Sequence, residues 1–230
     1  MRSCYMCSSP ATSDEHAPPK CLFPERKDVI DGVDHRKNLI TVPACDKHNS
    51  AKSHDDEYLL QCLAASYTSS VVGLTQFLTK VQRAFLRSPG KAAAFTRKSD
   101  PVQLRRVTGD SWENGLQVTI QGERIDEVLA NAARALYFHE TGKKFLGPAH
   151  VKTDFTMYNH AETQAKVTEA FRITSAYFET APRHGENPDV FWYKFEEGQA
   201  TAMFLFCFYS DSMALVRFSK IIVPGGARDA

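Results

Sequence analysis

The N-terminal quarter of the chain begins with Cys4-Tyr-Met-Cys7 and ends with Cys45-Asp-Lys-His48-Asn49. Structural zinc takes four tetrahedral ligands, commonly supplied by Cys sulfur and His nitrogen in two such closely spaced pairs. A metal can hold the long intervening loop closed. Two alternatives are that Cys4 and Cys7 are ordinary thiols near the terminus or that they form a disulfide, and an intracellular setting disfavours the disulfide. The spacing therefore favours a structural zinc site formed by Cys4, Cys7, Cys45 and His48.

Residues with a different chemistry lie between and directly after these pairs: Glu15, His16 and Asn49. A neutral imidazole with a pKa of about 6.5 can take a proton from water at neutral pH. A carboxylate, an amide oxygen and water molecules suit magnesium or manganese. An isolated Glu-His dipeptide usually lies on a solvated surface, but this one lies in the sequence between the two halves of the predicted zinc site. The pattern therefore indicates a second metal that works beside a general base.

The order of these motifs resembles that of the HNH (His-Me finger, ββα-metal) endonucleases over roughly residues 1–60. The resemblance implies metal-dependent hydrolysis of phosphodiester bonds, in DNA rather than RNA. It implies that His16 is the general base and that Glu15 and Asn49 bind the catalytic magnesium or manganese. Asn38 would be the middle Asn of the motif, which supports the loop and orients the base. The two short pairs would hold the structural zinc that some family members carry.

Two positions depart from the commoner family pattern. His48 stands where the last zinc ligand is often Cys, and Asn49 stands where the third motif residue is often His. Histidine is an equally good zinc ligand, so the zinc site is expected to persist. His54 follows on a predicted helix, where it could reach the metal or a phosphate, although a position on the helix surface is preferred. His35, in a polar loop, is expected to be solvated.

Basic residues are concentrated in the first half of a chain whose net charge is only +1. Between residues 80 and 106, the acidic side chain of Asp100 stands alone among Lys and Arg. A basic run is often only a solvated face, but phosphate backbones are bound mainly through such clusters. After a nuclease-like motif, the run is predicted to contact DNA. The residues expected to bind nucleic acid are Lys52, Arg83, Arg87, Lys91, Arg97 and Lys98.

The predicted fold class is α+β. The chain is expected to begin with a strand, a second strand and a helix arranged around one metal. The first strand should end at Glu15-His16, and the β-rich segment 39–42 should be the second. A helix is expected from about residue 46, with Asn49 on its first turn. Apolar residues at helical spacing predict another helix over 71–86, and 88–101 is the best candidate for a linker.

The second half is predicted to be a separate α+β domain that ends in an antiparallel meander. Helices are expected over 124–141 and 160–180, and the apolar segment 203–209 should be a central strand. Such a strand needs cover on both faces, from helices on one side and from another helix or a partner subunit on the other. The expected strands are 115–120, 151–157, 190–195, 201–209 and 213–219.

These elements divide the chain into an HNH finger (1–66), a helical and basic connecting region (67–110) and an α+β domain (111–230). The last domain could contact substrate, form a homodimer through its sheet or bind a regulatory partner. No apolar run is long enough to span a membrane. We expect no signal peptide, because the first residues lack its apolar core, and we expect a cytoplasmic protein, because six cysteines with metal-like spacing fit a reducing compartment. A free nuclease of low specificity is toxic to its host, so we expect its activity to be controlled, as in antiviral defence or in a mobile element.

Two other functions remain open. In one, the finger binds nucleic acid but does not hydrolyse it. In the other, the chain is an effector whose C-terminal domain senses a partner or ligand.

Overall fold

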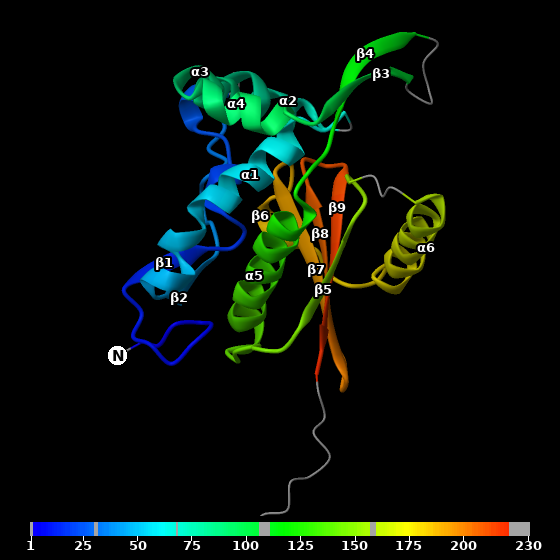
Figure 1. Ribbon diagram of the computed structural model, residues 1–230. Coiled ribbons are helices and arrows are strands. Elements are labelled where there is room, and N and C mark those ends of the chain that lie inside the picture. Colours follow the sequence, from blue (N-terminus) through cyan, green and yellow to red (C-terminus); the bar gives the residue numbers. More distant parts are fainter. Residues whose placement is uncertain (1, 30–31, 68, 106–110, 157–159, 221–230) are drawn as a thin grey trace, which may run out of the picture.

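The computed structural model describes residues 2–29, 32–67, 69–105, 111–156 and 160–220 (Figure 1). Within these residues it contains six α-helices and three antiparallel sheets, of two, two and five strands. The predicted α+β class is thus confirmed at this coarse level. None of the helices in the described residues is long and apolar enough to cross a membrane.

The first two-stranded sheet contains the dipeptide Glu15-His16. Strand β1 (Ser13–His16) pairs with β2 (Thr41–Ala44), so that Glu15 lies opposite Val42 and His16 opposite Thr41. Both predicted strands are present, although β2 begins later than expected and includes Pro43. Pro43 is tolerated because a two-stranded sheet leaves one edge of each strand unpaired.

The helix predicted from about residue 46 begins later in the structure. Two 3₁₀ turns, Asp46–His48 and Ser50–Lys52, precede helix α1 (Ser53–Ala64). Asn49 lies between the turns with φ −122° and ψ −73°, which is not helical. The expectation that Asn49 sits on the first turn of a helix is therefore wrong. The tighter turn brings Cys45 and His48 together, because the His48 N–H donates to the Cys45 carbonyl at 2.9 Å.

The predicted helix over 71–86 is confirmed. It consists of α2 (Val71–Gln76), a π turn at Phe77–Val81 and α3 (Gln82–Arg87). A sharp turn at Ser88 follows, where φ is −137° and ψ is 79°.

The segment 88–101 is not the linker that its composition suggests. It forms helix α4 (Pro89–Thr96) and the start of strand β3 (Ser99–Arg105), which pairs with β4 (Trp112–Val118). Pro89 occupies the first helical turn, where proline's fixed φ and missing N–H cost nothing. The β3–β4 hairpin projects from the end of the molecule that carries α2–α4 (Figure 1).

The largest sheet is formed by the C-terminal half of the chain. Its strand order is β5-β9-β8-β7-β6, and every neighbouring pair is antiparallel. The predicted three-strand meander is therefore confirmed. Strand β6 was not predicted, because its sequence His-Gly-Glu-Asn lacks apolar alternation. The predicted strand 151–157 is shorter, and residue 157 lies outside the described residues. The strands are β5 (Ala149–Thr153), β6 (His184–Asn187), β7 (Phe191–Glu197), β8 (Thr201–Phe208) and β9 (Ser212–Ser219).

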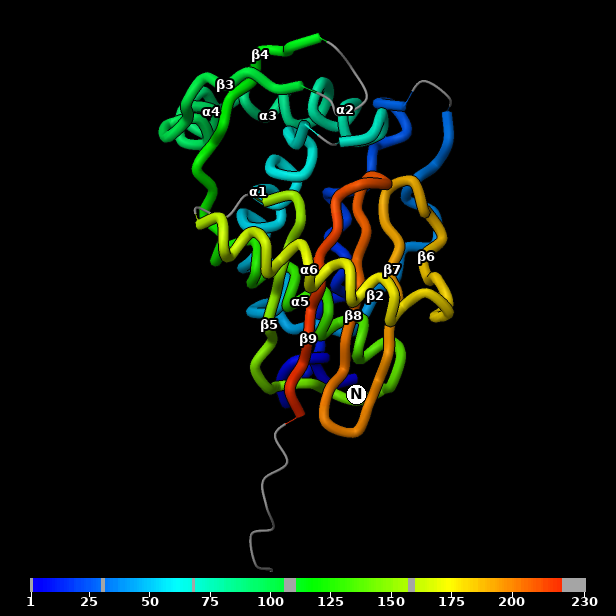
Figure 2. Tube along the Cα trace, turned by 90° about the vertical axis from the view of Figure 1, so that its right-hand side faces the viewer, coloured from blue at the N-terminus to red at the C-terminus, as the bar shows by residue number. Residues whose placement is uncertain are grey.

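Helices cover both faces of the central strand β8, as its apolar sequence predicts. Helix α5 (Gly122–Thr141) lies on one face and α6 (Ala161–Tyr177) on the other (Figures 1 and 2). Phe204 and Phe206 are fully buried in the cluster that contains the α5 side chains, whereas Leu205 packs with Val167 and Phe171 of α6. Burial of one such aromatic side chain stabilises the fold by about 1.5 to 3 kcal/mol.

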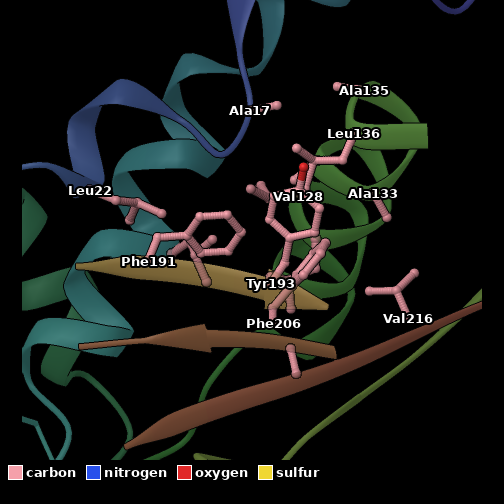
Figure 3. Packing of buried hydrophobic residues seen from close by; sticks show 14 of the residues in the cluster. Ala17, Leu22, Val128, Ala133, Ala135, Leu136, Phe191, Tyr193, Phe206 and Val216 are labelled. Carbon is pink, nitrogen blue, oxygen red and sulfur yellow. The ribbon is translucent and has the colours of Figure 1, made fainter. Parts of the chain in front are cut away.

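Helix α5 also joins the N-terminal part of the chain to the sheet. Both α1 and β2 contact α5. One buried cluster runs from Leu22 through Val128 and Leu136 of α5 to Phe191 and Phe206 of the sheet (Figure 3). The limits 1–66, 67–110 and 111–230 stay predictions, but hydrophobic packing is continuous between the first and last of these regions.

Candidate metal centre and active-site pocket

The four predicted zinc ligands form one compact cluster. The ligand atoms of Cys4, Cys7, Cys45 and His48 all lie within 4.8 Å of one another. The Cys7 and Cys45 sulfurs are 3.7 Å apart, and His48 Nδ1 lies 3.4 Å from the Cys4 sulfur and 3.3 Å from the Cys45 sulfur. Zinc bonds of about 2.0 to 2.3 Å in a tetrahedron place neighbouring donors at roughly these separations. The cluster could therefore hold a metal such as zinc.

Backbone hydrogen bonds fix the turn that carries Cys4 and Cys7. The Cys4 N–H donates to the Ser9 carbonyl at 2.9 Å, and the Tyr5 N–H donates to the Pro43 carbonyl on β2 at 2.8 Å. Hydrogen bonds from the side chain and backbone of Ser9 lower the pKa of Cys7 to about 6. The thiolate is the form that binds metal, so these bonds prepare Cys7 as a ligand.

A lysine from the distant half of the chain supports the same turn. Lys144, which follows α5, donates from Nζ to the Cys7 carbonyl at 2.7 Å and to Ser3 Oγ at 2.9 Å. A zinc ion with three thiolates carries a net negative charge, which a nearby ammonium group offsets. Sequence reasoning missed Lys144, because no local pattern links it to residues so far away in the chain.

A pocket of about 220 Å³ lies beside the cluster and contains three of the four predicted catalytic residues. Asn38 is exposed, does not line this pocket and has φ 53°, so its predicted role stays a prediction. We call this cavity the active-site pocket, a name that refers only to the three residues that the sequence predicts to be catalytic. Its lining residues are Glu15, His16, Pro19, Lys20, Cys21, Asn49, Ser53, Asp56 and Glu57.

Two of the residues that line this pocket, Glu15 and Asp56, are ion-paired to Lys52. The Lys52 ammonium lies 2.7 Å from Glu15 Oε1 and 2.8 Å from Asp56 Oδ2, and only 14% of its side chain is exposed. Burial raises the pKa of Glu15 above its ordinary value, although Lys52 opposes the shift. Lys52 was expected to contact nucleic acid, whereas here it neutralises two carboxylates. Asp56 was not predicted, and its spacing of four residues from Lys52 is the signal that could have found it.

The surroundings of His16 and Asn49 suit the proton transfer and metal binding that the sequence predicts for them. Burial lowers the pKa of His16, and the charges of Lys20 and Arg36 lower it further. The imidazole is therefore neutral at neutral pH, which is the form that can accept a proton. The Asn49 amide donates from Nδ2 to Ser13 Oγ at 2.8 Å, so its oxygen is the atom offered to a metal.

The remaining predicted nucleic-acid contacts divide into two groups. Arg83 forms a bidentate pair with the buried carboxylate of Asp28, with both N–O distances 2.7 Å, and Lys91 lies 2.7 Å from Glu57. Arg87, Arg97 and Lys98 are exposed.

The exposure of two further histidines, His35 and His54, can be compared with the sequence-based expectations. His35 is only 6% exposed, so the expectation that it is solvated is wrong. His54 is exposed, and it lines a second pocket of about 280 Å³ next to the active-site pocket.

No protein-family model, curated protein or solved structure matches this chain.

Proposed function

We propose that the chain is a metal-dependent HNH-type endonuclease that hydrolyses phosphodiester bonds in DNA. The observation that carries the proposal is that Glu15, His16 and Asn49 line one pocket beside a cluster able to hold zinc. The strand–strand–helix order around them agrees with the ββα-metal finger that the sequence resembles.

In the proposed reaction, His16 accepts a proton from water while the water oxygen bonds to phosphorus. The bond from phosphorus to the leaving oxygen then breaks, and that oxygen takes a proton from solvent. Glu15 and Asn49 would hold magnesium or manganese, which stabilises negative charge on the phosphate oxygens. A zinc ion held by His48 would restrict the position of Asn49, because His48 precedes it directly in the chain.

Plasmid cleavage with magnesium or manganese tests this proposal. We expect His16→Ala to lose at least about 100-fold in rate, since general base catalysis contributes that much or more. His150→Ala, which changes an exposed histidine on β5, should cleave like wild type. All three proteins should contain one zinc per chain. Equal cleavage by wild type and His16→Ala would exclude His16 as the base.

A second candidate function is nucleic-acid binding without hydrolysis. It is favoured by the ion pair between Lys52 and Glu15, because a catalytic metal must compete with that ammonium for the carboxylate. An electrophoretic shift with no cleavage in either metal would support this alternative.

A further inference from the structure

We propose that the pocket next to the active-site pocket receives one unstacked nucleobase of the strand that the protein binds. We call it the base pocket, and its principal residues are His54, Tyr58, Gln61, Phe95, Gln121 and Arg124. The inference rests on the proposed function, since it assigns the cleaved phosphate to the active-site pocket.

The two pockets lie on neighbouring faces of helix α1. His54, Tyr58 and Gln61 face the base pocket, at positions separated by four and three residues. Ser53 and Asp56 face the active-site pocket. Glu57 lies between these faces and lines both pockets. A phosphate in one pocket and a base from the same strand in the other can therefore be bound together.

Flat groups form the walls of the base pocket. The Arg124 guanidinium lies 4.2 Å from the Tyr58 ring centroid, and Asp55 fixes it through a 2.6 Å contact. The Phe95 ring meets Tyr58 edge to face at 6.2 Å. Proteins bind unstacked bases on aromatic rings and Arg planes, and the site of about 280 Å³ has room for one base.

Polar groups can read the edge of that base. Gln61 is only 8% exposed, and in the described parts of the chain its side-chain amide makes no hydrogen bond. A carboxamide offers one donor and one acceptor side by side, which is the pattern that pairs with a base edge. The ion pair between Glu57 and Lys91 balances charge at the same pocket, as expected for a neutral ligand.

A base inside a duplex cannot enter such a pocket without leaving the stack, which costs a few kcal/mol. The pocket therefore predicts that single-stranded DNA binds more tightly than duplex DNA of the same sequence. It also predicts that one nucleotide in the strand dominates the affinity.

Fluorescence anisotropy with a short single strand tests the inference, with His16→Ala as the protein background so that no cleavage occurs. Abasic nucleotides are placed at each position in turn. We expect one position to weaken binding by about 5- to 100-fold, as stacking of one base contributes. Gln61→Leu should weaken binding of the intact strand and reduce the effect of that abasic position, because the hydrogen bonds to the base edge are lost while the stacking rings remain. Gln82→Leu, on the exposed side of α3, is the matched control and should bind like its parent.

Three results would overturn the base pocket: equal loss at every abasic position, an intact abasic effect in Gln61→Leu, or duplex binding as tight as single-strand binding. A free nucleoside monophosphate that binds as tightly as the strand would also overturn it, because the pocket would then serve free nucleotides. Cleavage by wild type is measured separately. Failure of hydrolysis with the abasic pattern intact would reject the nuclease and keep the base pocket.

Discussion

At the scale of single residues, Lys52 governs the charge of the candidate site. Its ammonium contacts the carboxylates of Glu15 and Asp56, and all three side chains are largely buried. Two buried carboxylates without a counter-ion would repel each other and lose hydration. A divalent metal and Lys52 therefore compete for Glu15 in the proposed reaction.

Replacement of Lys52 tests this competition. Lys52→Ala should lower the free energy of unfolding by about 3 kcal/mol in buffer without added magnesium or manganese and without chelator, because it leaves two buried charges unpaired. Millimolar magnesium or manganese should restore much of that loss, measured as the melting temperature with and without metal. Lys47→Ala, on an exposed residue of the adjacent turn, should change neither value. A Lys52→Ala melting temperature that does not respond to either metal would argue against Glu15 as a metal ligand.

The Arg83–Asp28 pair gives a pH-dependent prediction. Only 4% of the Asp28 side chain is exposed, and hydrogen bonds from Arg83 lower its pKa. A carboxyl group whose pKa is lowered on folding stabilises the protein at pH values above its unfolded pKa of about 3.9. This stabilisation is lost as the pH falls through the folded-state pKa. Arg83→Ala should thus cost about 1 to 2 kcal/mol at pH 7 and less at pH 2.5, which lies below the unfolded pKa. Urea unfolding at both pH values measures this, and an equal loss at the two pH values would contradict the ion-pair origin.

At the scale of elements, helix α5 matters most because it packs against the sheet on one side and against α1 on the other. Its C-terminus is set by Gly142, which has φ 68° and donates its N–H to the Phe138 carbonyl at 2.9 Å. This left-handed conformation is favourable for glycine and strained for residues with a Cβ atom. The end of α5 directs the chain toward Lys144, which contacts the turn that carries Cys4 and Cys7.

A pair of glycine substitutions tests the role of this helix end. A Cβ atom would meet open space at both Gly122 and Gly142, but only Gly142 has positive φ. Gly142→Ala should therefore destabilise the protein by about 1 kcal/mol, whereas Gly122→Ala should be neutral or slightly stabilising. Thermal unfolding of both variants provides the comparison. Equal effects would show that the left-handed conformation does not determine the cost.

At the scale of the whole molecule, the turn that carries Cys4 and Cys7 is packed onto the same core as the large sheet. Lys144 reaches the turn from the end of α5, and the buried cluster continues from Leu59 to Phe206. The metal cluster is thus attached to the main core through packing and through a charged hydrogen bond.

Removal of zinc should destabilise the entire chain. Because metal binding contributes folding free energy, a strong chelator should lower the melting temperature in proportion to the zinc removed. We expect far-UV circular dichroism and tryptophan fluorescence to report one common transition, with Trp192 on β7 as a probe within the sheet. Two separate transitions, with fluorescence unchanged by chelation, would show that the finger unfolds independently.

The sequence by itself determined the features that depend on neighbouring residues. The two short ligand pairs predicted the metal cluster, the 3.6-residue period predicted α5 and the α2–α3 helix, and the doubly apolar strand predicted cover on both faces. These signals are local because backbone conformation and apolar periodicity are set within a few residues.

Only the tertiary structure decided which distant groups meet. It brought Lys144 to the turn that carries Cys4 and Cys7, buried Lys52 between two carboxylates and brought Phe95 and Arg124 against the Tyr58 ring. It also made α4 from a segment whose composition suggested a linker. Such contacts arise when hydrophobic faces far apart in the chain are buried together. Because hydrophobic burial is non-directional, it leaves no fixed spacing in the sequence from which these contacts could be predicted.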